Sequence, residues 1–209
     1  MMRISVFVLI VAMSLCATGA MAALFQNGGF ELPAQAADGT YNGVVATGWT
    51  TYTNGTCNPQ LLRYTPPSAV IVPEGAQYGQ MQVTTINKYA GYRQTFDTIA
   101  GATYTIKGWY RPLSGTAVAS VGVDTSGGIV RPATWLAQLS GATSVLWNTF
   151  SGQATATGPS MTIFLDVAIG GTNNKAAAFD GIVIPEPGSM IALLSGLVGL
   201  VGFGIRRRK

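Results

Sequence analysis

The stretch that decides the fold is Met161-Thr162-Ile163-Phe164-Leu165-Asp166-Val167-Ala168-Ile169. Met161 and every second residue after it are large and aliphatic, whereas the residues between them are mixed in character. Successive side chains of a strand point to opposite faces, so this alternation predicts a β-strand with one face buried in a core.

The same pattern recurs along the chain on either side of this stretch. Residues 103–110 alternate in the same way, and further runs rich in β-forming residues cover 80–85, 91–96, 117–123, 145–156 and 177–184. Clusters of Gly, Pro, Asn and Ser separate the runs, and none of the body has a convincing helical period. Eight or so short strands with frequent turns predict an all-β fold, a jelly-roll β-sandwich, as one domain over residues 23–184.

The charge of the chain is concentrated at its ends. The whole sequence carries a formal net charge of +4, but residues 23–184 hold seven basic and seven acidic residues. A neutral body lacks the basic surface that binds phosphate backbones, so no nucleic-acid partner is expected. The chain has no His. This excludes Ser-His-Asp and Cys-His catalysis and histidine-ligated metals.

The N-terminus has the parts of a secretory signal. Arg3 precedes the apolar run 4–15, and Ala20-Met21-Ala22 has the small-x-small pattern of a cleavage site. We therefore expect residues 1–22 to be a signal peptide that directs export through the Sec machinery. Cleavage would remove Cys16 and leave Cys57 as the only cysteine, either a partly buried thiol, which we favour, or an intermolecular link.

The C-terminus has three parts in a fixed order. Pro185-Glu186-Pro187 is followed by the uncharged residues 188–205 and then by Arg206, Arg207, Arg208 and Lys209. Eighteen uncharged residues are just long enough for a transmembrane helix, and the basic cluster places the C-terminus on the cytoplasmic side.

This tail closely resembles the PEP-CTERM sorting signal. The resemblance implies recognition by an exosortase-type membrane protease, removal of the helix near Pro185-Glu186-Pro187, and delivery to the cell surface or extracellular matrix. The membrane attachment would then be transient, and the protein would accompany exopolysaccharide. An ordinary single-span anchor is the alternative.

The body resembles carbohydrate-binding modules of the galactose-binding-like jelly-roll superfamily. The resemblance lies in the order of short motifs: Asn27-Gly28-Gly29-Phe30-Glu31, Gly48-Trp49, residues 91–96, residues 100–106 and Phe179-Asp180-Gly181-Ile182. It implies a structural calcium held by Glu31 and Asp180, since Ca²⁺ prefers hard oxygen ligands. Gly181 departs from the Asn usual at this position. The alternative is that Glu31 is a solvated charge and Asp180 caps a turn.

Aromatic side chains are the candidates for contact with sugars, because sugar rings stack on aromatic faces. Trp109 shares the polar face of its strand with Arg111, and Tyr92-Arg93 is expected on a neighbouring strand, so these residues could form one platform. Trp135 is a candidate in a loop. The bound polysaccharide would come from the envelope or matrix. A second apolar face covered by a loop is an equal alternative for the Trp109 side.

Two other functional classes compete with sugar binding. The seven carboxylates of the body are scattered singly in the sequence, so no catalytic pair is evident, and we expect no enzyme. A structural or adhesive matrix protein without a specific sugar site is the main alternative, because charge is low and strand edges and aromatics can mediate adhesion.

Overall fold

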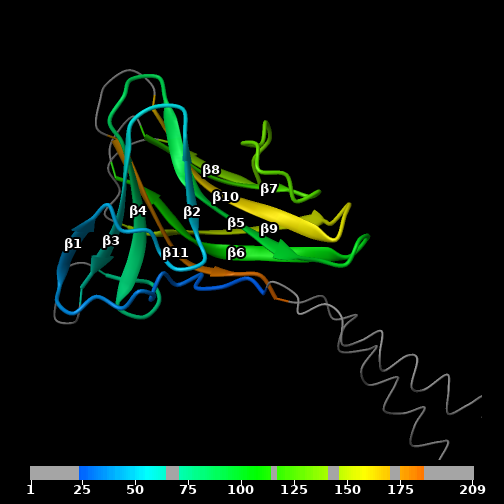
Figure 1. Ribbon diagram of the computed structural model, residues 1–209, viewed down its shortest axis with the longest axis horizontal. Coiled ribbons are helices and arrows are strands. Elements are labelled where there is room, and N and C mark those ends of the chain that lie inside the picture. Colours follow the sequence, from blue (N-terminus) through cyan, green and yellow to red (C-terminus); the bar gives the residue numbers. More distant parts are fainter. Residues whose placement is uncertain (1–23, 65–70, 114–116, 141–145, 170–174, 186–209) are drawn as a thin grey trace, which may run out of the picture.

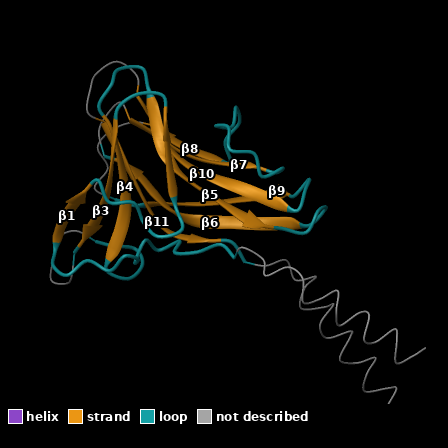
Figure 2. Cartoon of the chain, in the orientation of Figure 1, coloured by secondary structure: helices purple, strands orange, loops and turns teal. Residues whose placement is uncertain are grey.

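The protein is a sandwich of two antiparallel β-sheets (Figures 1 and 2). The computed structural model describes residues 24–64, 71–113, 117–140, 146–169 and 175–185. The six-stranded sheet has the order β1 (Gly39–Asn42), β3 (Cys57–Arg63), β4 (Gln77–Val83), β11 (Lys175–Val183), β6 (Thr103–Pro112) and β9 (Asn148–Thr155). The five-stranded sheet has the order β2 (Thr50–Thr53), β5 (Tyr89–Asp97), β10 (Ser160–Ile169), β7 (Ala117–Asp124) and β8 (Ala137–Ser140).

The stretch that predicted the fold is the central strand of the five-stranded sheet. Strand β10 pairs with β5 on one side and with β7 on the other, and Leu165 lies opposite Tyr92 and Val121. Met161, Ile163 and Leu165 point into the sandwich and are fully buried. The prediction of an all-β sandwich is thus confirmed.

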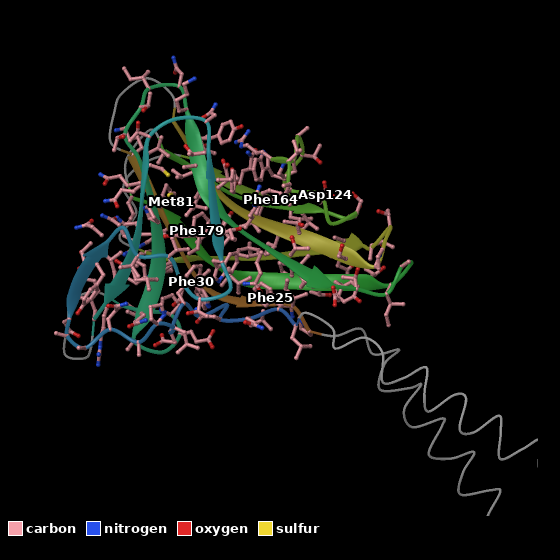
Figure 3. All side chains as sticks on the ribbon, in the orientation of Figure 1. Phe25, Phe30, Met81, Asp124, Phe164 and Phe179 are labelled. Carbon is pink, nitrogen blue, oxygen red and sulfur yellow. The ribbon has the colours of Figure 1, made fainter. Side chains whose placement is uncertain are left out.

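The core lies between the two sheets. Phe30, Met81 and Phe179 are fully buried there, in one cluster with the inward side chains of β10 (Figure 3). Burial of a side chain of this size contributes about 1.5–3 kcal/mol relative to leaving it in water.

Strands β1, β2, β3 and β8 were not among the runs expected from the sequence. Three of them have only four residues, and β3 contains Pro59. Such sequences give too few repeats for a clear alternation. Cys57, at the start of β3, is half-buried and forms no disulfide within the described residues, and burial raises the pKa of its thiol.

The segment before β1 closes the sandwich against the last strand. The N–H of Ile182 donates to the carbonyl of Gly28 at 3.0 Å, and the indole N–H of Trp49 donates to the carbonyl of Asn27 at 3.0 Å. This places Glu31, which follows directly, at the same end of the six-stranded sheet as Asp180.

The predicted signal peptide and the predicted transmembrane helix, with Glu186, Pro187 and Arg206 to Arg208, lie outside the described residues. Within the described ranges no helix is long and apolar enough to cross a membrane.

Candidate functional site

A buried ion pair lies on the outer face of the five-stranded sheet. Asp166 points outward from the middle of β10, yet its side chain is fully buried because other side chains cover it. Arg131, in the loop between β7 and β8, donates from Nε to Oδ2 and from Nη2 to Oδ1 of Asp166, both at 2.8 Å. A two-pronged bond of this kind fixes the orientation of the guanidinium as well as its position.

Two aromatic rings lie close to this guanidinium. The Cζ of Arg131 is 4.2 Å from the ring centroid of Tyr89 and 4.7 Å from that of Trp135. Cations are attracted to aromatic faces at these distances, so the three side chains hold one another in place. Arg131 remains 26% exposed, and its Nη1 group makes no hydrogen bond within the described part of the chain.

Tyr52 completes the covering of Asp166. Its hydroxyl donates to Oδ2 of Asp166 at 2.8 Å. Burial, with the adjacent Asp166 charge, raises the pKa of Tyr52 far above its ordinary value, so the hydroxyl stays protonated. The hydrogen bond to Asp166 in turn raises the pKa of Arg131, which stays charged.

The loop between β7 and β8 is anchored at further points on this face. Arg93, which points outward from β5, donates from Nη1 to the carbonyl of Ile129 at 2.6 Å. A Cβ at Gly122 of β7 would lie 2.7 Å from both Pro132 and Trp135, so the absence of a side chain there lets the loop pack closely. We call this set the Arg131 platform: Tyr52, Tyr89, Arg93, Arg131, Trp135 and Asp166.

The structure divides the predicted sugar-binding residues among three places. Trp135 and Arg93 both belong to the Arg131 platform. Tyr92 is 0% exposed and lies in the core, with its hydroxyl donating to the carbonyl of Gln80 at 2.7 Å. The prediction that Tyr92 contributes to a surface platform is therefore wrong; its position on β5 gives it the inward direction, whereas Arg93 next to it faces outward.

Trp109 and Arg111 lie on the other side of the molecule, on the outer face of the six-stranded sheet. They share this face as predicted, but Arg111 is only 8% exposed. Its guanidinium lies 4.7 Å from the ring of Trp147 and 5.4 Å from that of Tyr78, in a covered cluster. Arg111 is therefore not a surface ligand contact, and the predicted single platform does not exist.

Four platform residues were not placed in the predicted site: Tyr52, Tyr89, Arg131 and Asp166. Tyr52 and Tyr89 are among the aromatic candidates of the sequence, but no motif sets them apart from the others. A signal for the ion pair was present, since Asp166 is the one charged residue in the sequence of β10. An outward carboxylate at such a position needs a partner when a loop covers it.

A second group of polar residues lies where the first and last segments meet. One carboxylate oxygen of Glu31 accepts hydrogen bonds from the N–H groups of Ala76 and Gln77, both at 2.8 Å. The buried Asp180 accepts from the N–H of Glu74 at 2.9 Å. Glu74 also contributes its own carboxylate, and a Cβ at Gly181 would lie 3.0 Å from its Oε2.

Glu74 therefore occupies the space that a side chain at position 181 would fill. Glu31, Glu74 and Asp180 are far apart in the sequence, but the fold brings them near enough for the charges of Glu74 and Glu31 to act on Asp180.

The electrostatics of these three carboxylates suit a cation. Burial, first, and the charges of Glu74 and Glu31 raise the pKa of Asp180 to about 8, although two backbone N–H groups oppose the shift. The donor set of carboxylate oxygens fits Ca²⁺. Within the described ranges, however, no three acidic, His or Cys side chains are already close enough together to hold a metal ion, so binding would require the carboxylates to move closer together.

Comparison with known proteins agrees with this architecture. The fold is a β-sandwich of the carbohydrate-binding-module kind. A solved structure of TmCBM61 in complex with β-1,4-galactotriose is similar over 80% of this chain and 99% of that chain, with a TM-score of 0.54 and 14% identity. The tailspike protein 4 of bacteriophage CBA120 is similar over 78% of this chain but only 21% of its own length, with a TM-score of 0.50 and 14% identity.

A third similar structure is the CBM22-1 xylan-binding domain from Paenibacillus barcinonensis, with a TM-score of 0.46 and 16% identity over 71% of this chain and 96% of that one. At these identities the likeness concerns the fold alone. Comparison with curated proteins finds no match. Residues 183–209 match the PEP-CTERM protein-sorting motif, which marks an exported protein sorted to the cell surface.

Proposed function

We propose that this is a non-catalytic polysaccharide-binding protein of the cell surface or extracellular matrix, and that the Arg131 platform is its binding site. The observation that carries the proposal is the guanidinium of Arg131, which Asp166 fixes beside the rings of Tyr89 and Trp135 and whose Nη1 makes no hydrogen bond to the described residues. The likeness in fold to carbohydrate-binding modules supports it.

The platform suits the two kinds of surface that a sugar residue presents. The C–H faces of a pyranose ring pack on aromatic side chains, here Trp135 and Tyr89, while its hydroxyl groups need directed hydrogen-bond donors. Arg131 and Arg93 provide such donors in fixed positions. Because Asp166 and Tyr52 hold Arg131 before any ligand arrives, binding loses little side-chain entropy.

The sorting motif gives the setting of this activity. We propose that a signal peptide over residues 1–22 directs the chain into the Sec machinery and that residues 23–184 form the working domain. An exosortase-type membrane protease would then cleave near Pro185-Glu186-Pro187, so that residues 188–205 serve only as a transient anchor. The partner polysaccharide would be exopolysaccharide of the same cells.

The hydrogen bonding and burial of the carboxylates favour a binding role over catalysis. Asp166 is bound to Arg131 and Tyr52, and Asp180 is fully buried. A glycosidase needs two carboxyl groups facing a substrate across the scissile bond. We propose instead that Glu31, Glu74 and Asp180 hold a structural Ca²⁺ that ties the first and last segments together.

The test is co-sedimentation of the exported protein with exopolysaccharide purified from the same cells. Trp135→Ala should weaken binding about tenfold, since stacking against a sugar ring is of the order of 1.4 kcal/mol. Tyr64→Ala is the matched control, because it removes a half-buried ring that lies just after β3 and stacks on Tyr78 of the six-stranded sheet. Equal retention of the Trp135→Ala variant and the wild type would contradict the proposal.

The same material separates the competing classes. Release of new reducing ends from the polysaccharide during incubation would indicate an enzyme. Self-association of the protein with no retention on polysaccharide would indicate a purely structural matrix protein.

A further inference from the structure

A groove on the outer face of the six-stranded sheet has no role in the sugar binding proposed above, although Glu74 of the proposed calcium site lies at its edge. Its volume is about 640 Å³, and the residues that line it include Pro73, Glu74, Lys107, Trp109, Ser151 and Pro185. It lies on the side of the sandwich opposite to the Arg131 platform, because β6 and β9 belong to one sheet and β5 and β10 to the other.

Trp109 is held in a fixed orientation in this groove while much of its ring stays accessible. The side chain is 36% exposed. Its Cδ1 would lie 3.0 Å from a Cβ at Gly181, so the indole packs directly over the backbone of β11. Gly181 has a φ of +54° and lies where the register of β11 against β6 is irregular, a conformation that favours glycine. The indole therefore rests on a surface that only glycine provides.

Polar groups surround the indole on the same face. Lys107 lies two residues before Trp109 on β6, and Thr149 and Ser151 of β9 pair with Trp109 and Lys107 respectively. Glu74 lines the groove from the segment before β4. One positive and one negative charge, with two hydroxyl groups, give the groove no net charge but several donors and acceptors.

Side chains cover one end of the outer face of the six-stranded sheet, and the groove lies at the other end, which is accessible. Farther along the face, Trp147 donates from its indole N–H to the carbonyl of Ile71 at 2.8 Å, and Tyr78 and Leu62 are buried in the same cluster. The expectation that a loop covers this face thus holds for the Arg111 end of β6, whereas the Trp109 end is accessible.

We propose that the Trp109 groove is a second carbohydrate-binding site, for neutral sugar residues, and that the protein binds two polysaccharide strands at once. An exposed indole amid uncharged and compensating polar groups fits a neutral pyranose better than an anionic one. Sites on opposite faces cannot be spanned by one short segment of polysaccharide. One molecule therefore joins two strands, and the cross-linking rests on the binding function proposed for the Arg131 platform.

The experiment measures binding and cross-linking separately on the exported protein. Dissociation constants for neutral galactan and xylan oligosaccharides report binding, and light scattering from mixtures with the long polymers reports cross-linking. The variants are Trp109→Ala, Trp135→Ala and the double variant, with Tyr64→Ala as control. Ser151→Arg, on the exposed face of edge strand β9, blocks the groove without removing the indole, and thermal unfolding checks that each variant is folded.

Each single variant should weaken binding about tenfold at one site and lower the light scattering, while the double variant should weaken binding about tenfold at both sites. Scattering from both Trp109→Ala and Ser151→Arg equal to that of the wild type would overturn the second site and leave the platform intact. Unchanged binding stoichiometry and scattering in Trp135→Ala would instead refute the function proposed for the platform.

The competing occupant of the groove is the chain's own sorting segment, since Pro185 lines the groove. A synthetic peptide of residues 183–190 tests this. Displacement of the peptide by oligosaccharide, with oligosaccharide the tighter ligand, would support a sugar site. Saturable peptide binding that oligosaccharide cannot displace would overturn the proposal.

Discussion

Glu31 offers the cleanest test of calcium at the level of a single residue. Its Oε1 accepts two backbone hydrogen bonds. Glu31→Gln keeps an oxygen at that position and removes only the charge. If Glu31 is a ligand, calcium at about 100 times its dissociation constant should stabilise the wild type by about 2.7 kcal/mol and the variant far less.

Thermal unfolding with calcium and with EDTA measures this difference. Asp97→Asn, which removes one exposed carboxylate from the end of β5, is the control and should respond as the wild type does. A wild type whose melting temperature is the same in calcium and in EDTA would show that the three carboxylates hold no calcium.

The raised pKa of Asp180 predicts that the stability of the fold depends on pH. Its pKa is about 8 in the folded protein, against an ordinary value of 3.8. Between these values the folded state binds a proton that the unfolded state has lost, so without metal the stability should fall as pH rises from about 4 to about 8. The largest possible slope for one such proton is about 1.4 kcal/mol per pH unit.

Urea unfolding in EDTA at several pH values measures the slope. Asp180→Asn should abolish the contribution of this residue, whatever its effect on stability at a single pH. A slope that persists unchanged in Asp180→Asn would mean that another group titrates in this range.

At the level of the elements, strands β5 and β10 approach each other closely at Gly91. A Cβ at Gly91 would lie 2.1 Å from the backbone carbonyl oxygen of Leu165 and 2.7 Å from the hydroxyl of Tyr52. Gly91→Ala must therefore push the two central strands apart or displace Tyr52 from Asp166. We expect a loss of about 1–3 kcal/mol in the free energy of unfolding.

Gly158→Ala is the matched control, since a Cβ there would meet only the Ser126 carbonyl oxygen, at 3.8 Å. Chemical denaturation of the two variants makes the comparison. Equal stability of the two would contradict the close approach of β5 and β10.

The sequence predicted where the strands lie along the chain better than it predicted which strands and side chains lie next to one another in the sandwich. Alternation identified β10 and β6 because both are long. In β10, however, the outward side chains Thr162, Phe164 and Asp166 are also fully buried, so this strand is covered on both faces and not on one as predicted. It could not show that Trp109 and Trp135 lie on opposite sheets, because the order of strands in a sandwich depends on pairing between distant segments. The hydrogen bonds between Arg131 and Asp166, 35 residues apart, depend on the same pairing.

At the level of the whole molecule, the net positive charge and the folded domain lie in different parts of the chain. The basic residues that make the sequence positive lie in the terminal segments, outside the described domain, whereas the body has balanced charge. The sorting motif at residues 183–209 then determines where this body is delivered.

Processing of the tail makes a prediction at the same scale. If an exosortase-type protease acts on the chain, the protein recovered from the cell surface should end near Pro185-Glu186-Pro187. Mass spectrometry of the intact protein from exporting cells checks this. A mature protein that still carries residues 188–209 would instead indicate a permanent anchor.

Hydrogen–deuterium exchange of the exported protein with and without its exopolysaccharide tests the central claim most directly. The loop of residues 125–136 carries Arg131 and Trp135 over the five-stranded sheet, and a bound strand would restrict its opening. We predict slower exchange in peptides from this loop when polysaccharide is present at saturation. Unchanged exchange in this loop while polysaccharide is demonstrably bound would contradict the assignment of the Arg131 platform as the binding site.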